Sequence, residues 1–262
     1  RPGSLLKNWA IDGYGPYLWI TEWEAGANSE AIANVVSKIA EASERVYSRQ
    51  SAGLGFLGAV VLVRPKKGVP ELPRLLWGQV PESRFEVREG ERRYWAQCLG
   101  ARHPGLFLDH RPLRDWLEQS GSCRGKSVLN TFAYTGSLSV AAALGGASRV
   151  VTQDLSQATL TWAKENLALN SSALHTQDVS LEWLAGDFFE QGPRLGRKGE
   201  SFGVVISDPP SFSRGKKGNF STQKDLVHLH QILLSLVEPG GLLVSSINSA
   251  NVSWSKFEGE LI

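Results

Sequence analysis

The chain has 262 residues, of which 42% are hydrophobic and 21% are charged. This length and mixture are typical of one large or two modest globular domains, and they exclude a disordered or collagen-like chain. The 28 Lys and Arg residues barely outnumber the 26 Asp and Glu residues. A surface for a nucleic acid would therefore have to come from local clusters of basic side chains.

The sequence has no clear pattern for membrane insertion, export or metal binding. No stretch approaches the ~18 apolar residues of a membrane span, and no basic-then-apolar segment begins the chain, so we expect neither membrane insertion nor export. Cys98 and Cys123 are too few for a disulfide framework and lie in no zinc-binding pattern, which favours the cytosol. His228 and His230 are two apart on a predicted helix, and His110 is expected to serve the structure. We therefore predict no metal site.

Residues 1–100 have the pattern of a small α/β domain. Residues 16–24 and 59–64 are rich in β-branched and aromatic side chains and predict strands. Between them, apolar side chains recur with helical spacing over residues 28–47, after the cap candidates Asn28 and Ser29.

A predicted β-hairpin follows. Residues 83–89 and 92–98 alternate as strands do, and Gly90 lies in the turn between them. The hairpin links the small domain to a second domain, residues 101–262.

From residue 127 onward, short apolar runs alternate with helical patterns. This rhythm predicts an open parallel sheet with helices on both faces and ligands at the carboxyl ends of its strands. The fold class is therefore α/β, a Rossmann-like sheet preceded by the small α/β domain and the linking hairpin. The strands are expected at residues 127–132, 149–154, 202–207 and 241–246, with a short one before Asp187.

Residues 130–136, here called the 130–136 loop, join a strand to a helix, and Gly136 lies where the backbone would approach a ligand. Asp154 ends the next strand, where a carboxylate can bind two ribose hydroxyls. The glycines of a dinucleotide loop are absent, because Phe132 and Tyr134 stand in the loop. A nucleoside ligand without phosphates, such as S-adenosylmethionine, fits better than NAD. The alternative is a plain corner with Asp154 as a helix cap.

Asp187 follows the expected third strand. Its carboxylate could bond the adenine amino group while Phe188 packs against the ring. Alternatively, Asp187 lies in a turn and Phe188 in the core.

Residues 208–213, here called the 208–213 loop, are the most specific string in the chain. A buried strand delivers Asp208 at its end, and Pro209 and Pro210 stiffen the turn that follows. Many methyltransferases present the target base at this position. The alternative is that the two prolines merely end the strand.

Together these motifs resemble the bacterial class I S-adenosylmethionine-dependent 23S ribosomal RNA methyltransferases. The likeness is greatest to the guanine-N7 module of the bifunctional large-subunit enzymes, with the large-subunit cytosine-C5 enzymes as a sister group. It covers residues 83–250 well and the first domain more loosely. The motifs that carry it are residues 105–111, 130–136, 154–156 and 208–213.

The resemblance implies roles for these residues. Asp208 would lie beside the transferable methyl group, and residues 107–111 across the cofactor pocket. Because the family's sheet has further strands, we expect the second domain to be incomplete at Ile262. A separate RNA-recognition domain, common in relatives, is not visible. The implied cofactor contacts are Asn130, Phe132, Tyr134 and Gly136 at the methionine part, Asp154 and Leu155 at the ribose, and Asp187 and Phe188 at the adenine.

The target base follows from the chemistry that each base needs. Methylation of cytosine C5 requires a cysteine thiolate that attacks the ring, and alignment on Lys224 and Asp225 places Phe220 where the cytosine branch has that cysteine. Guanine N7 already carries a lone pair, so positioning alone can suffice. Ser211 and Phe212 match the guanine-N7 pattern, and Phe212 could stack on the base or pack in the core. Guanine N7 is therefore favoured, with cytosine C5 second.

Three basic stretches lie in segments rich in glycine or proline and are expected to be loops. Residues 214–218 adjoin the 208–213 loop, so Arg214, Lys216 and Lys217 are the expected contacts to RNA phosphates. Residues 64–68 and 194–199 are weaker candidates, because a charge run is usually a solvated loop. Rival functions are a small-molecule or protein methyltransferase and an RNA-binding assembly factor without turnover.

Overall fold

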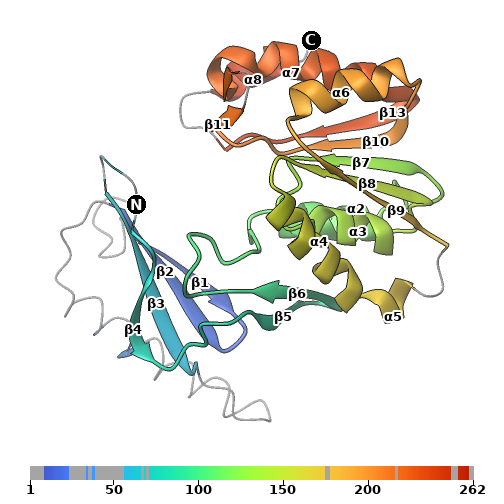
Figure 1. Ribbon diagram of the computed structural model, residues 1–262. Helices are drawn as coiled ribbons and strands as arrows, with labels where there is room; N and C mark the ends of the chain where they lie inside the picture. Colours follow the sequence, from blue (N-terminus) through green and yellow to red (C-terminus); the bar gives the residue numbers. More distant parts are fainter. Residues whose placement is uncertain are drawn as a thin grey trace. The chain divides into compact units, whose positions relative to one another are not determined.

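The computed structural model divides after Leu108 into two compact units, Arg1–Leu108 and Asp109–Ile262, whereas the sequence places the division after residue 100. Figure 1 shows the elements of both units. The structure describes residues 9–23, 34, 37–38, 56–65, 68, 71–174, 178–215, 218–248 and 253–259.

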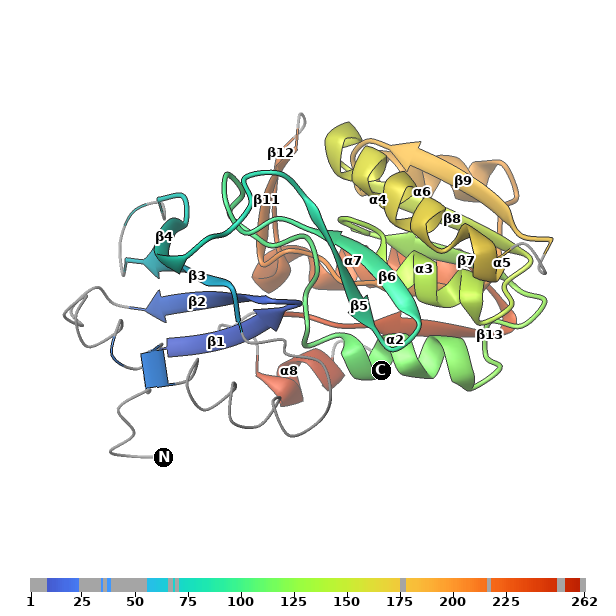
Figure 2. The same cartoon turned by 90° about the horizontal axis from the view of Figure 1, so that it is seen from below.

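The first unit contains a four-stranded sheet in the order β1-β2-β3-β4, which Figure 2 shows side by side. The predicted strands at residues 16–24 and 59–64 are confirmed as β2 and β3, which pair in parallel. The outer strands β1 and β4 were not predicted. The predicted helix lies outside the described residues apart from positions 34, 37 and 38, which are helical. The strands are β1 (Trp9–Tyr14), β2 (Tyr17–Trp23), β3 (Gly58–Arg64) and β4 (Arg74–Gly78).

The predicted hairpin is also confirmed. Strands β5 (Phe85–Glu89) and β6 (Arg92–Ala96) pair antiparallel, and Gly90 turns between them with a φ of 60°. Val87 and Tyr94 lie opposite each other and are buried, so one face of the hairpin is covered.

The second unit has the predicted open sheet. Its five strands are all parallel and lie in the order β13-β10-β7-β8-β9. Every residue of β10 is buried, as expected for a strand covered on both faces. The strands are β7 (Ser127–Thr131), β8 (Arg149–Asp154), β9 (Ser180–Ala185), β10 (Phe202–Ser207) and β13 (Val237–Ser245).

Helices cover both faces of this sheet. Figure 1 shows α2, α3 and α4 on one face and α6 and α7 on the other. On the α6 and α7 side, Phe188, Leu195, Leu229 and Leu233 pack against Leu129 and other side chains of the strands. The helices are α2 (Arg111–Gln119), α3 (Ser137–Leu144), α4 (Gln157–Leu169), α5 (Ser171–Leu174), α6 (Phe188–Arg197), α7 (Thr222–Ser235) and α8 (Trp254–Gly259).

The expectation that residues 194–199 form a loop is wrong, because most of them belong to α6. Pro193 lies inside this helix, where proline removes a hydrogen bond and is normally disfavoured. The helix forms nevertheless, because Asp187 caps its first turn and Phe188 and Leu195 bury one side of it. Burial outweighs the local preference of the Gly-Pro pair.

The strand order fixes where a ligand can bind. The chain runs outward from β7 through β8 to β9 and then crosses to β10 on the other side of β7. At such a switch point the loops after the two strands diverge and leave a crevice at their carboxyl ends. Those loops are the 130–136 loop after β7 and the 208–213 loop after β10. The latter leads into an unpredicted hairpin, β11 (Phe212–Gly215) and β12 (Gly218–Ser221).

No helix in the described part of the chain is long and apolar enough to cross a lipid bilayer.

Candidate functional site at the carboxyl ends of the strands

The 130–136 loop has an unusual backbone. Phe132 and Tyr134 have φ values of 53° and 50°, and Gly136 has a φ of 73°. The left-handed region is rare for bulky L-residues and costs of the order of 1–3 kcal/mol at each position, so such residues persist only where the surroundings enforce them. Strain of this kind gathers at binding sites.

The end of β8 enforces this conformation. The N–H of Ala133 donates to the Gln153 carbonyl oxygen at 2.9 Å, and the N–H of Tyr134 donates to Asp154 Oδ2 at 2.8 Å. The N–H of Gly136 closes the turn onto the Ala133 carbonyl oxygen at 2.8 Å. The loop is thus preformed and is held by the neighbouring strand.

Gly136 serves the packing of helices. A Cβ at this position would lie 2.7 Å from the Ala163 Cβ of α4, and the positive φ also disfavours a side chain. Close contact with α4 therefore accounts for this glycine, and a role toward the cofactor stays a prediction.

Asn130 lies in a buried polar network. Its Nδ2 donates to Ser139 Oγ at 2.9 Å, and the Thr152 hydroxyl donates to the same Ser139 oxygen at 2.8 Å. Asn130 Oδ1 is buried and has no hydrogen-bond partner among the residues that the structure describes. An acceptor of this kind at a strand end calls for a partner such as water or a ligand.

Asp154 is more than a helix cap. Its Oδ1 accepts from the Ser156 N–H at 2.8 Å and from the Thr159 hydroxyl at 2.9 Å, whereas Ser156 is the N-cap of α4. Oδ2 accepts only from Tyr134 among the described residues, so it can take a further hydrogen bond. Leu155, next along the chain, is 48% exposed. A carboxylate beside an exposed aliphatic side chain suits a ribose joined to a flat apolar base.

Asp187 and Phe188 begin α6. Asp187 Oδ1 accepts from the Phe189 N–H at 3.0 Å as the N-cap, and this leaves Oδ2 for another donor. Phe188 is buried and packs edge-to-face against Phe132 with ring centroids 5.6 Å apart. The structure therefore gives Phe188 a place in the core, and its contact with a ligand stays a prediction.

Asp208 ends β10 with both carboxylate oxygens engaged. Oδ2 lies 2.9 Å from Nε2 of His110, and Oδ1 accepts from the Ser246 hydroxyl at 2.6 Å. Burial raises the pKa of Asp208, but the hydrogen bonds from His110 and Ser246 outweigh it and bring that pKa below its ordinary value. The carboxylate is therefore ionised.

Sequence reasoning missed the role of His110 and Ser246. His110 precedes α2 without capping it through its side chain, and Ser246 follows β13. The segment 105–111 was singled out, but which of its side chains contacts the site could not be read from it. Nothing in the local pattern distinguishes Ser246.

The prolines of the 208–213 loop differ in burial. Pro209 is buried and Pro210 is exposed, and the Ser211 hydroxyl donates to the Asn248 carbonyl oxygen. Phe212 is 52% exposed, so it is not a core residue. Of the predicted phosphate contacts, Arg214 lies in β11, and Lys216 and Lys217 lie outside the described residues.

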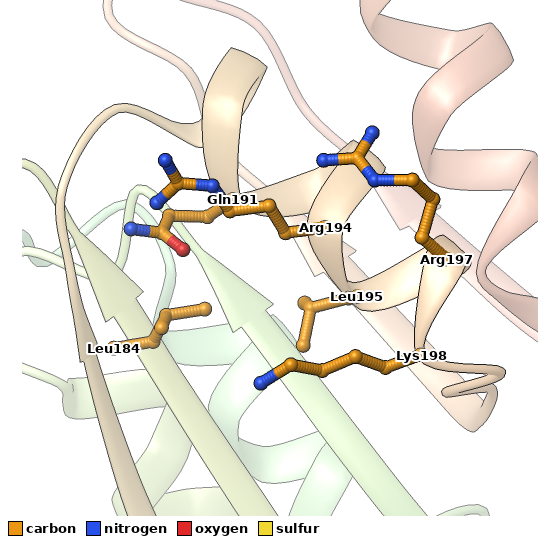
Figure 3. Close-up of a pocket in the computed structure, with 6 residues that line it drawn as sticks. All are labelled: Leu184, Gln191, Arg194, Leu195, Arg197 and Lys198. Carbon is orange, nitrogen blue, oxygen red and sulfur yellow. The ribbon is translucent and has the colours of Figure 1, made fainter.

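The basic side chains among residues 194–199 line a depression beside α6. Arg194, Arg197 and Lys198 surround a depression of about 320 Å³ on α6, floored by Leu184 and Leu195 (Figure 3). Cations in the last turn of a helix are stabilised by its dipole, which accounts for at least part of this cluster.

The two histidines of α7 are unsuited to a shared metal. His230 is buried, and its Nδ1 faces the Leu226 carbonyl oxygen, so Nδ1 carries the proton and Nε2 accepts from the Ser245 hydroxyl. His228 is exposed and stacks on Phe189. In the described part of the chain, no group of three or more His, Cys, Asp or Glu side chains could hold a metal ion.

Residues 73–258 match the model of a family described as S-adenosylmethionine-dependent methyltransferase. The chain belongs to this family. The resemblance seen in the motifs is confirmed at this level, and so are the enzyme class and S-adenosylmethionine as the methyl donor.

Relatives of this methyltransferase carry more specific names. It is 40% identical over 171 residues to the ribosomal RNA large subunit methyltransferase K/L of Chromohalobacter salexigens, covering 63% of this chain and 22% of that protein. It is 33% identical over 253 residues to the protein of the same name from Aeromonas hydrophila, covering 92% of this chain and 32% of that protein. The chain thus spans a third or less of the length of these relatives.

A solved structure supports the fold and the cofactor. A methyltransferase complexed with SAH superposes with a TM-score of 0.78 at 28% identity, covering 97% of this chain and 61% of that one. The predicted Rossmann-like class I methyltransferase fold is confirmed.

The residues of this methyltransferase fit the cofactor. Ribose hydroxyls are donors, and Asp154 Oδ2 retains an acceptor position. Asp208 lies at the carboxyl end of β10, the strand next to β7, and its place beside the cofactor stays a prediction. Leu155 offers apolar surface, and Asn130 Oδ1 is an acceptor to which no described residue donates. No phosphate cradle is present in the 130–136 loop, which agrees with a ligand that has no phosphates.

Proposed function

We propose that this methyltransferase modifies RNA, with large-subunit ribosomal RNA as its substrate and guanine N7 as the acceptor. The observation that carries the proposal is the 208–213 loop, in which an anchored Asp208 is followed by two prolines and an exposed Phe212. The names of the relatives support the RNA substrate, and RNA modification fits the cytosolic location favoured by the cysteine content.

Methyl transfer to guanine N7 needs no acid, base or nucleophile from the protein. The cofactor supplies an electrophilic methyl group on a sulfonium, and guanine N7 supplies a lone pair without loss of a proton. The chain's residues then have to hold the base in line and exclude water. An exposed Phe212 can stack on a base, which is worth ~1–3 kcal/mol.

The second candidate, cytosine C5, needs a thiolate. Burial raises the pKa of Cys98 to about 12 and that of Cys123 to about 11, and neither thiol is exposed. Thiols with such pKa values are almost wholly protonated near neutral pH and cannot attack a pyrimidine. The buried state of both cysteines therefore favours guanine N7.

Contact with RNA is assigned to Arg214, Lys216 and Lys217, because this basic stretch follows the 208–213 loop directly. The small α/β domain could add further contacts. The basic stretch is too small to read a sequence, so it would bind phosphates and position the RNA, while the site selects the base.

The test is transfer of labelled methyl from S-adenosylmethionine to unmodified large-subunit RNA, followed by digestion and mass spectrometry of the nucleosides. Label in 7-methylguanosine is the expected result. Label in 5-methylcytidine would overturn the choice of base. Activity on a protein or small molecule, with none on deproteinised RNA, would overturn the RNA substrate.

The variant Asp208→Ala distinguishes a methyltransferase from a non-catalytic RNA-binding assembly factor. The methyltransferase loses methyl transfer and keeps its fold, measured by circular dichroism. A binding factor shows no transfer in the wild-type chain and binds RNA equally well in both forms.

A further inference from the structure

His110 and Asp208 form a link between two distant parts of the second unit. They are 98 positions apart in sequence, yet Nε2 of His110 lies 2.9 Å from Asp208 Oδ2. The side chains are 17% and 30% exposed, so the pair is largely withdrawn from water. The contact joins the start of α2 to the carboxyl end of β10.

Ser246 completes the arrangement from the other side. Its hydroxyl donates to Asp208 Oδ1 at 2.6 Å, and its N–H donates to the Ser207 carbonyl oxygen at 2.9 Å. The carboxylate is therefore held at both oxygens, by the imidazole of the residue before α2 and by the hydroxyl of the residue after β13. The rotation of Asp208 about its side-chain bonds is removed.

The charges around His110 favour its protonated form. The hydrogen bond to Asp208 raises the pKa of His110, and the charges of Asp208 and Asp109 act in the same direction. Burial and the charge of Arg114, also on α2, oppose them, and the net pKa is raised. A charge-assisted hydrogen bond of this kind is stronger than a neutral one.

We propose that His110 is a positioning residue for methyl transfer, holding the Asp208 carboxylate in one orientation so that the 208–213 loop keeps the geometry that transfer needs. His110 acts through Asp208 and need not touch the substrate. The inference rests on the proposed function, because it takes RNA as the acceptor of the methyl group. It does not depend on which base is methylated.

Because the pKa of His110 is raised, the rate of methyl transfer should depend on pH. The imidazolium persists above the ordinary histidine pKa of ~6.5, and it is lost as pH rises through the raised value. The rate of methyl transfer should therefore be highest below that pH and fall above it, as the ion pair with Asp208 becomes a weaker hydrogen bond from a neutral imidazole to the carboxylate.

The experiment compares single-turnover methyl transfer to RNA in four proteins between about pH 6 and about pH 9. They are the wild type, His110→Ala, His110→Gln and the control His228→Gln, which changes an exposed histidine outside the site. His110→Ala should lose about 10²-fold in rate, the scale of a ~1 Å misplacement. His110→Gln keeps an N–H donor without the charge, so it should be faster than His110→Ala and should show, across the pH range, about the reduced rate that the wild type reaches on the alkaline side. The control should retain the wild-type profile.

Two results would overturn the proposal. One is a wild-type rate in His110→Ala. The other is the same alkaline fall in His110→Gln as in the wild type, because the fall would then belong to another group.

Failure of the proposed function would look different. If the wild type transfers no methyl to any RNA, hydrogen–deuterium exchange at the amides of Ser207, Asp208 and Ser211 decides the positioning role, since Pro209 and Pro210 have no amide hydrogen. Faster exchange in His110→Ala than in His110→Gln supports it, and equal exchange in the two variants overturns it.

Discussion

The backbone N–H of Tyr134 donates to Asp154 Oδ2 at 2.8 Å, so the carboxylate that ends β8 also holds the strained loop that follows β7. The two strand ends of the cofactor site are therefore coupled before any ligand binds. Asp154 has one function inside the fold and, by proposal, another toward the ribose.

Asp154→Asn should separate these functions. The amide replaces one acceptor oxygen with a donor, so one of the three groups that donate to Asp154 loses its partner. We expect the free energy of unfolding to fall by about 1–3 kcal/mol. Affinity for S-adenosylhomocysteine should fall about tenfold or more, equivalent to ~1.4 kcal/mol. Urea denaturation and calorimetric titration measure the two effects.

The matched control is Thr159→Val, which removes a single donor to Asp154 and preserves the shape of the side chain. It should cost about 1 kcal/mol of stability and leave the affinity for S-adenosylhomocysteine unchanged. If Asp154→Asn binds S-adenosylhomocysteine as tightly as the wild type, Asp154 does not belong to the cofactor site.

Gly136→Ala tests the packing of α3 against α4. The new Cβ would lie 2.7 Å from the Ala163 Cβ on a backbone with a φ of 73°. The left-handed conformation costs ~1–2 kcal/mol and overpacking ~1–3 kcal/mol, so the free energy of unfolding should fall by at least about 2 kcal/mol. The double variant with Ala163→Gly relieves the contact but not the backbone strain, and should recover only part of the loss. A Gly136→Ala protein as stable as the wild type would contradict this account.

The sequence predicts β7, β8 and β10 well because each is a short apolar run that ends in, or is followed by, a polar residue, whereas β9 has no such run and β13 begins four residues before the predicted strand. Asn130, Asp154 and Asp208 are visible for this reason, and the parallel sheet brings their strand ends to one edge. Local pattern also misleads, since Gly192 and Pro193 indicate a loop where burial of Phe188 and Leu195 maintains a helix. The pairing of His110 with Asp208 depends on the packing of α2 near β10, which no local pattern contains.

Replacement of both cysteines tests the choice of base. We expect the Cys98→Ala, Cys123→Ala protein to transfer methyl groups at the wild-type rate, because buried thiols of raised pKa are not nucleophiles. Each substitution should cost ~1 kcal/mol of stability from the small void it leaves. The rate is measured with labelled cofactor at a temperature where both proteins are folded. Loss of transfer in a folded single variant would identify the attacking thiol and restore cytosine C5.

Neutralising the basic stretch tests its contact with RNA. In the Arg214→Gln, Lys216→Gln, Lys217→Gln protein, the slope of log affinity against log salt should fall by about one for each lost phosphate contact, about three in all. The matched control is Arg194→Gln, Arg197→Gln, Lys198→Gln, which removes the same charge from the α6 depression. If RNA binds along the carboxyl ends of the strands, the slope of log affinity against log salt changes less in the control protein than in the first variant. Equal changes would mean that net charge alone governs binding, and S-adenosylhomocysteine affinity should be unaltered in both proteins.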